Sequence, residues 1–364
     1  MSFLSAFSRT PHPSPVTADD RAILMVDPGF GRVFTDHMVT IRYTAGQGWH
    51  SHKVEPRGPI PLDPAASVLH YAQEIFEGMK AYKTDDGRVA LFRPEQNARR
   101  FQASAERLAM PQLPEDMFLE AVREIVKVDA DWIPEGEGSL YLRPFMIATE
   151  AFLGVRAANE YLFVVLASPV GGYFKGGKNS VTIRVSEHYT RAARGGTGAA
   201  KCGGNYAASL VAQAEAVANG CDQVVFLDAA EGKWIEELGG MNIFFVFKDG
   251  SLQTPPLGGT ILPGVTRASI LQLAKDAGVT VREAPYAFEQ WRADVASGEV
   301  VEAFACGTAA VLTAISKVVA PGGDFTIGDG KPGPVTTEML AKLTGIQRGR
   351  VADPHNWVQT VIEA

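Results

Sequence analysis

A glycine-rich segment at residues 169–177, with the sequence PVGGYFKGG, interrupts the chain near its middle. An unbroken apolar run at 161–167 precedes it and is typical of a buried strand, and an alternating strand-like run at 181–185 follows it. A chain of 364 residues is longer than a single hydrophobic core usually accommodates. The sequence therefore predicts two α/β domains. The expected bounds are an arm and lead-in at 1–35, a small domain at 36–170, a linker at 171–179 and a larger, sheet-rich domain at 180–364.

Apolar periodicity and turn residues predict the elements of both domains. In the first we expect a strand at 37–43, a polar stretch at 44–59, a helix from Pro94, a helix at 118–128 and a strand at 139–147. In the second we expect a helix at 206–218 stopping at Asn219-Gly220, strands at 223–227, 243–247, 300–304 and 311–319, and a late helix at 336–343.

Composition excludes several classes of protein. Hydrophobic residues at 46% and charged residues at 21% argue against disorder, and the longest apolar runs are too short to span a membrane. A net charge of −7 without a basic stripe argues against nucleic acid as a partner. The three cysteines show no CxxC spacing, and the N-terminus lacks the apolar centre of a secretory signal. We expect a cytoplasmic protein that needs no metal.

Lys201 lies in a turn of small residues, AAKCGGNY at 199–206. Little side-chain bulk surrounds it, so it can be partly desolvated, and desolvation lowers the pKa of an ammonium group. Only the neutral amine attacks a carbonyl to form a Schiff base. The alternative is an ordinary solvated surface charge.

Three downstream segments carry what a pyridoxal phosphate site needs. Glu237 stands between two strand-like runs and offers a carboxylate to the ring nitrogen of such a cofactor. The segment LPGVTR at 262–267 precedes an amphipathic helix, whose N-terminus attracts phosphate. The turn CGTAA at 306–310 offers further amides and a hydroxyl. A phosphate-ligand binding protein without chemistry remains an alternative, which the pairing of Lys201 with Glu237 disfavours.

Two arginine positions are candidates for anion binding. In the helix from Pro94, either Arg99 or Arg100 faces inward if the stripe containing Phe101 is buried, and an inward guanidinium matches a phosphate. In the strand at 139–147, Tyr141 and Arg143 share one face and can meet a carboxylate together. Alternatively, both helix arginines are solvated surface charges, and Tyr141 and Arg143 belong to an ordinary strand face that binds no ligand.

From about Asp36 to the C-terminus, the sequence resembles the branched-chain amino acid aminotransferases, which are pyridoxal 5′-phosphate enzymes of fold type IV. The resemblance is carried by the Lys201 segment, the segments from Glu237 to Arg267, and the motifs FEGMKAY at 76–82, YLRP at 141–144 and PVGGYF at 169–174. It implies reversible transamination of leucine, isoleucine and valine with 2-oxoglutarate. It also implies a homodimer in which a loop near 153–155 of the partner chain closes each site.

The same resemblance implies roles for individual residues. Lys201 would be the catalytic residue and hold the cofactor, Arg100 rather than Arg99 would bind its phosphate, and Glu237 would bind its ring nitrogen. The other implied cofactor-binding residues are Tyr206, Leu262, Val265, Thr266 and Thr308. The implied substrate-binding residues are Phe34, Tyr71, Tyr141, Arg143, Tyr173, Ala309 and Ala310.

Two relatives of the same fold stay open as alternatives at this point. A D-amino acid aminotransferase or an aminodeoxychorismate lyase would keep Lys201 and Glu237 and differ at the residues that bind the substrate carboxylate. Tyr71, Tyr141 and the segment 76–78 favour the branched-chain enzymes. The sequence does not rank the three branched-chain substrates, because one methylene contributes only about 1–3 kcal/mol of discrimination.

Overall fold

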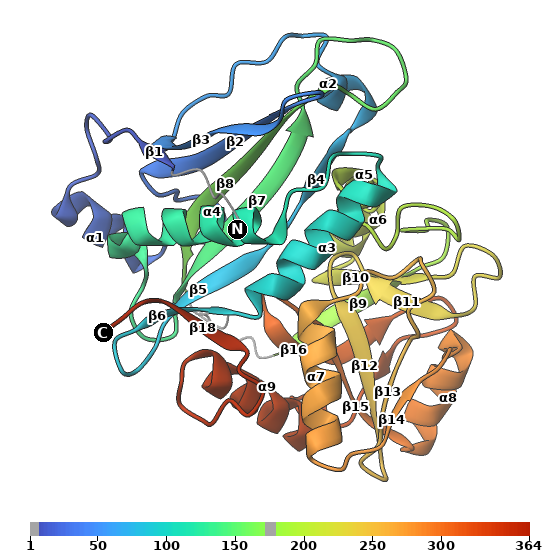
Figure 1. Cartoon of the computed structure of the whole chain (residues 1–364). Helices are drawn as coiled ribbons and strands as arrows, with labels where there is room; N and C mark the ends of the chain where they lie inside the picture. The colour runs from blue at the N-terminus through green and yellow to red at the C-terminus, as the bar shows by residue number, and fades with distance from the viewer. Residues whose placement is uncertain (1–6, 172–179) are drawn as a thin grey trace. The chain divides into compact units, whose positions relative to one another are not determined.

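The computed structural model describes residues 7–171 and 180–364, which form two compact α/β units (Figure 1). Of the described residues, the first unit comprises 7–171, 200–203 and 345–364, and the second comprises 180–199 and 204–344. Within the described residues, each unit is built on one nine-stranded sheet. The expected linker at 171–179 falls, except for Gly171, outside the described residues.

The sheet of the first unit has the strand order β1-β3-β2-β8-β7-β5-β6-β18, with β4 paired to β7. Its strands are β1 (Ser8–Arg9), β2 (His37–Thr44), β3 (Gly48–Pro56), β4 (Glu74–Phe76), β5 (Met79–Lys83), β6 (Val89–Phe92), β7 (Ser139–Ala148), β8 (Glu160–Val170) and β18 (Val358–Ile362). Its helices are α1 (Ala18–Val26), α2 (Ser67–Tyr71), α3 (Pro94–Arg107), α4 (Glu115–Val128) and the short 3₁₀ helix η1 (Ala130–Trp132).

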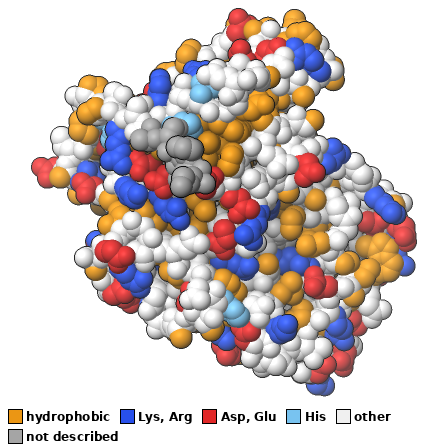
Figure 2. Space-filling view, in the orientation of Figure 1, with side chains coloured by type: hydrophobic (Ala, Val, Ile, Leu, Met, Phe, Trp, Pro, Cys, Tyr) orange, Lys and Arg blue, Asp and Glu red, His pale blue; other side chains and the backbone are white. Residues whose placement is uncertain are grey.

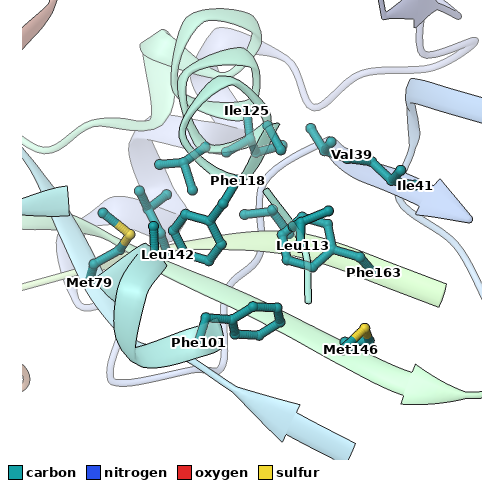
Figure 3. Close-up of a cluster of buried hydrophobic side chains, with 14 of the residues drawn as sticks. Val39, Ile41, Met79, Phe101, Leu113, Phe118, Ile125, Leu142, Met146 and Phe163 are labelled. Atoms are coloured by element: carbon teal, nitrogen blue, oxygen red, sulfur yellow. The ribbon is translucent and has the colours of Figure 1, made fainter. Parts of the chain in front are cut away.

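The hydrophobic core of the first unit lies between its sheet and the helices α3 and α4 (Figure 3). Phe101 of α3 packs against Phe118 of α4 and Phe163 of β8, with ring centroids 5.4 and 5.5 Å apart. The strand β8 is buried on both faces along most of its length, which confirms the buried strand expected at 161–167. This core fixes α3, and α3 carries Arg100.

The structure differs from the sequence-based expectations at three places in this unit. The polar stretch at 44–59 contains β3, because its backbone pairs antiparallel with β2 although the sequence shows no apolar alternation. The described part of the arm is tied to the unit: β1 pairs with β3, and Arg9 forms an ion pair with the buried Glu124 at 2.7 Å. The last residues return to the first unit, because β18 pairs with β6, whereas the expected second domain extended to residue 364.

The sheet of the second unit has the strand order β11-β10-β9-β16-β15-β12-β13-β14, with β17 paired to β16. Its strands are β9 (Ser180–Ser186), β10 (Gln223–Leu227), β11 (Ile235–Leu238), β12 (Asn242–Phe247), β13 (Leu252–Thr254), β14 (Val281–Glu283), β15 (Val300–Gly307), β16 (Val311–Val319) and β17 (Phe325–Thr326). Its helices are α6 (Leu210–Ala218), α7 (Val265–Asp276) and α8 (Phe288–Ser297). The chain passes between the units within α5 (Gly203–Ala207) and α9 (Pro334–Gln347).

The helix expected at 206–218 is interrupted. The Ser209 hydroxyl donates to the carbonyl of Tyr206 at 2.7 Å, so that turn is satisfied locally and α5 ends before α6 begins. The expected stop is confirmed, since α6 ends at Ala218 and Gly220 has a φ of 70°. The large apolar side chains of α6 do not face the core: Leu210, Val211 and Val217 are exposed, whereas the small residues Ala212 and Ala216 are buried.

Acidic and basic side chains are interspersed on the face shown in Figure 2. Among the described residues, no helix combines the length and the apolar character that crossing a membrane requires.

Candidate active site

Lys201 belongs to the first unit, where two backbone hydrogen bonds hold it. Its N–H donates to Ser104 Oγ of α3 at 2.9 Å, and its carbonyl accepts from the N–H of Phe76 on β4 at 2.9 Å. Two residues on, the N–H of Gly203 donates to Glu74 Oε1. A Cβ at residue 203 would lie 2.3 Å from that oxygen, so the close approach requires glycine. The small residues around the lysine therefore let its backbone dock on α3 and β4.

The amine of Lys201 is surrounded by groups that favour its neutral form. Burial, followed by the positive charge of Arg100, lowers the pKa of Lys201 from 10.5 to about 8, although the Glu77 carboxylate acts in the opposite direction. Nζ lies 4.8 Å from the centroid of the Phe76 ring. The desolvation expected from the sequence is therefore present, and near pH 8 about half of these amines are unprotonated.

A buried carboxylate, Glu77, influences the Lys201 amine electrostatically and is bound by two residues of α3. Arg100 binds it with Nε at 2.7 Å and Nη2 at 2.8 Å, and Asn97 Nδ2 donates to it at 2.8 Å. Burial by itself would raise the pKa of Glu77, but the charge and hydrogen bonds of Arg100 bring it below the ordinary value. A buried ion pair of this kind keeps both charges in place, because removing either partner leaves the other uncompensated.

The two candidate arginines of α3 are distinguished clearly. Arg100 is buried, whereas Arg99 is exposed and bonds to Glu115 at 3.2 Å. The expectation that one of these two arginines faces inward is thus confirmed, and the inward one is Arg100; its role towards a phosphate stays a prediction.

Tyr141 and Arg143 share one face of β7, as the alternation of the strand indicated. Arg143 Nη2 donates to the Tyr141 hydroxyl at 2.9 Å, and its guanidinium lies over the Phe76 ring at 4.7 Å. The Nε of Arg143 is buried without a partner. A Cβ at Gly78 would lie 2.3 Å from the Tyr141 hydroxyl, so glycine is required there as well. Both residues also contribute to the pKa of Lys201, which places them near its amine.

Tyr71 and Phe34 also belong to the first unit. The Tyr71 hydroxyl donates to the carbonyl of Leu153, so this tyrosine is joined to the loop at 153–155. Phe34 is partly exposed, and the Arg57 guanidinium lies over its ring at 5.1 Å. No contact of either residue with Lys201 is seen among the described interactions. Tyr173 falls outside the described residues.

In the second unit, Glu237 of β11 is a buried carboxylate with three partners. Arg191 pairs with its Oε1 at 2.6 Å, the N–H of Leu262 donates to Oε1 at 3.0 Å, and Asn242 Nδ2 donates to Oε2 at 3.1 Å. The arginine and the two neutral donors all favour the ionised carboxylate. Such a carboxylate can hold a proton on a ring nitrogen.

Asn242 lies beside Glu237 and beside the two segments of the second unit that the sequence predicts to bind an anion. Its Nδ2 also donates to the carbonyl of Leu262 at 3.1 Å, and a Cβ at Gly264 would lie 2.0 Å from its Oδ1. On β12, it is the register partner of Cys306, the residue before the turn at 307–310. The N-terminus of α7 and this turn therefore both lie beside Asn242.

The remaining predicted cofactor residues occupy these segments. Val265 begins α7, with Gly264 as its N-cap, and Thr266 is buried in its first turn. Thr308, Ala309 and Ala310 form the turn between β15 and β16. Directly after that turn, Val311 has a φ of 63°, which is unfavourable for a β-branched residue and is typical of a functional turn. The Tyr206 ring lies beside Gly240, because a Cβ there would be 3.6 Å from its Cε1.

Sequence reasoning gave no role to Glu77, Arg191 or Asn242. Glu77 and Asn242 lie within segments that had been singled out, and their signal was a polar residue in an otherwise buried strand or turn. Arg191 showed no local signal, because its partner Glu237 is distant in the sequence. Among the described residues, no group of three or more His, Cys, Asp or Glu side chains is placed to hold a metal ion.

Each unit, taken by itself, carries groups that fit a part of pyridoxal 5′-phosphate. The first unit supplies a lysine amine of lowered pKa and a buried arginine. The second supplies an ionisable carboxylate with a fixed hydrogen-bond set, and a helix N-terminus at which Gly264 leaves no room for a Cβ.

Comparisons with known proteins agree with this chemistry. Residues 74–318 match the family model described as amino-transferase class IV. The chain is 55% identical over 357 residues to the branched-chain-amino-acid aminotransferase of Mycolicibacterium smegmatis, covering 97% of each chain. It is similar to the solved branched-chain amino acid aminotransferase of Escherichia coli, with a TM-score of 0.76 and 28% identity over 90% of this chain and 99% of that one. The solved enzyme of Thermobaculum terrenum, in its PLP-bound holo-form, gives a TM-score of 0.72 and 25% identity over 90% and 99% of the two chains.

Proposed function

Because the chain belongs to the class IV aminotransferases, we propose that it is a branched-chain amino acid aminotransferase that uses pyridoxal 5′-phosphate. It transfers the amino group of leucine, isoleucine or valine to 2-oxoglutarate, reversibly. The relative with 55% identity over nearly the whole chain supports this substrate class. The single structural observation that carries the chemistry is the lowered pKa of the desolvated Lys201 amine.

Bound pyridoxal 5′-phosphate supplies a reactive carbonyl and an electron-withdrawing ring. Lys201 Nζ would hold the cofactor, and the free amine would move the proton at the substrate α-carbon. An amine whose pKa lies near 8 suits both tasks, because it is neutral often enough to attack a carbonyl and basic enough to accept a proton. The backbone bonds to Ser104 and Phe76 fix the position from which it acts.

Glu237 keeps the ring nitrogen of the cofactor protonated, and the Tyr206 hydroxyl bonds to its phenolic oxygen. The Arg191 ion pair and the bonds from Leu262 and Asn242 support the first role, because they favour the ionised form of the carboxylate. The phosphate is bound by Arg100, by the amides and hydroxyl of Val265 and Thr266, by the Leu262 segment and by Thr308. Burial of Arg100 and the N-terminus of α7 support this assignment.

Tyr141 and the amides of Ala309 and Ala310 bind the substrate carboxylate, and Arg143 receives the second carboxylate of glutamate. The buried Nε of Arg143, which has no partner, supports an anionic group at that position. Phe34 and Tyr173 supply apolar walls.

The functional form is a homodimer in which a partner loop near 153–155 closes each site. Apolar side chains around this loop are exposed, among them Leu153, Val155 and Leu69, as expected for an interaction surface. Since the Tyr71 hydroxyl donates a hydrogen bond to the carbonyl of Leu153, Tyr71 and this loop contribute together to the same substrate site.

The experiment is an absorption spectrum of the holoenzyme, recorded alone, after leucine, and again after 2-oxoglutarate. We expect a yellow band that fades with leucine and returns with the 2-oxo acid. In Lys201→Met, turnover is expected to be lost, whereas binding of the cofactor through its phosphate is expected to stay measurable.

Lys80→Met provides a matched control, because burial and the nearby Arg348 also lower the pKa of Lys80 to about 8. This variant is expected to keep the yellow band. Normal turnover by Lys201→Met, or a holoenzyme whose spectrum leucine does not change, would contradict the proposal.

A further inference from the structure

A cavity of about 600 Å³ lies within the second unit and is lined only by residues of that unit. Its lining includes Arg194, Asp228, Trp234, Glu236, Pro256 and Thr260. Glu236 and Glu237 are neighbours on β11, and successive side chains of a strand point to opposite faces. The cavity is therefore on the side of the strand that faces away from the Glu237 carboxylate, and none of the proposed catalytic or cofactor-binding side chains lines it.

Glu236 has an unsatisfied carboxylate oxygen at this cavity. The residue is only 7% exposed, and its Oε2 is buried without a hydrogen-bond partner. The Thr260 hydroxyl bonds to the same carboxylate. Burial raises the pKa of Glu236, as expected for a carboxylate removed from water with few donors. Buried polar atoms are rarely left without a partner, so Oε2 indicates a missing donor.

The charges of the lining favour a cation. Asp228 accepts hydrogen bonds from the backbone N–H groups of Ala230, Glu231, Lys233 and Trp234 at 2.8–3.1 Å. Burial opposes its ionisation, but these four donors keep its pKa below the ordinary value. Two carboxylates thus face one exposed guanidinium, that of Arg194.

The remaining wall is apolar and aromatic. Pro255, Pro256, Pro285 and Ile261 line the cavity together with Trp234. The indole of Trp234 already accommodates an ammonium group, since Lys233 Nζ lies 4.3 Å from its ring centroid. A ligand that matches this lining has a positive N–H donor at one end and a short apolar body.

We propose that this cavity binds a small organic ammonium compound, whose N–H donates to Glu236 Oε2 and whose apolar part packs against Trp234 and the prolines. The ammonium group belongs to a free amine or to an amino acid, whose carboxylate would then meet Arg194. The site is separate from the transamination site, and its occupancy does not depend on the proposed function.

The test is isothermal titration calorimetry of the holoenzyme with N,N-dimethyl-3-methylbutylamine. This tertiary amine is protonated near neutral pH and cannot condense with a carbonyl, so it does not react with the cofactor. Saturable binding is expected, with at least tenfold weaker binding of the neutral 3-methyl-1-butanol. Equal affinity for the alcohol, or no binding of the amine, would overturn the proposal.

Two variants locate the site. Glu236→Gln keeps the shape of the side chain and removes its charge, and it is expected to weaken amine binding at least tenfold, because bonds to charged groups are the stronger ones. Arg194→Ala removes an exposed like charge and is expected to tighten amine binding. Unchanged affinity in Glu236→Gln, or weaker binding in Arg194→Ala, would contradict the assignment, and the second variant decides the matter if the first does not fold.

The same titration with N,N-dimethyl-L-leucine distinguishes the two sources of the ammonium group. Binding that is tighter than that of the amine, and that loses this advantage in Arg194→Ala, identifies an amino acid. Binding that is weaker than that of the amine identifies a free amine, because the added carboxylate is then repelled by Glu236 and Asp228 without a compensating bond to Arg194.

Discussion

The reactivity of Lys201 in the cofactor-free protein is expected to follow a pKa of about 8. At pH 7 an amine with that pKa is about one-tenth neutral, whereas an ordinary lysine with a pKa of 10.5 is neutral in about one molecule in three thousand. Because only the neutral amine attacks a carbonyl, the environment of Lys201 raises the reactive fraction about 300-fold at pH 7. The neutral fraction rises with pH, reaches one half near pH 8 and levels off about one to two pH units higher.

Two charge changes next to Lys201 shift this midpoint in opposite directions. Glu77→Gln removes the negative charge that favours the ammonium form, so the midpoint is expected to fall by about one pH unit or more. Arg100→Met removes the positive charge that disfavours it, so the midpoint is expected to rise above that of the unmodified protein.

The assay is the rate at which the absorption of a covalent adduct appears when pyridoxal is added to the cofactor-free protein between pH 6 and 11. Pyridoxal has no phosphate, so the loss of a phosphate ligand in Arg100→Met does not affect the comparison. Circular dichroism of each variant serves as the folding control. A midpoint near 10.5 in the unmodified protein, or a higher midpoint in Glu77→Gln, would refute the reasoning.

Three further changes test other parts of the structure. Gly78→Ala places a Cβ 2.3 Å from the Tyr141 hydroxyl and is expected to raise KM for leucine at least tenfold. The control is Gly58→Ala, where a Cβ meets nothing within 4 Å and KM stays unchanged. Equal KM values for the two variants in steady-state kinetics would refute the contact. Arg191→Met leaves the buried Glu237 carboxylate without its ion pair and is expected to cost about 3–5 kcal/mol of unfolding free energy. In a double-mutant cycle, adding Glu237→Gln to Arg191→Met recovers part of that loss, and strict additivity in urea unfolding would argue against the pair. Phe118→Ala leaves a cavity in the core of the first unit and is expected to lower the unfolding free energy by about 3–5 kcal/mol. Val155→Ala, at an exposed position, is expected to lower it by less than about 0.5 kcal/mol. Similar losses for the two variants in urea unfolding would contradict the packing.

The sequence alone determined the class of fold, the family and the chemistry, because short local segments of the sequence are sufficient to indicate each of them. The Lys201 turn, the segment before α7 and the turn at 306–310 have local signatures in small residues and glycines. Local periodicity predicted that Arg99 or Arg100 faces inward if Phe101 is buried, and the resemblance to the family, not the periodicity, selected Arg100.

The tertiary structure alone decided how these side chains are held and charged. Glu77 meets Arg100 and Asn97, and Glu237 meets Arg191, across separations of 20–46 residues that no periodic pattern records. Tyr71 joins the loop at Leu153, 82 residues away, and β18 returns to β6 through backbone pairing. Local segments encode which residues are buried and which turns form, but a pKa or an ion pair depends on desolvation and on charges from other elements. Those conditions exist only when the chain has folded.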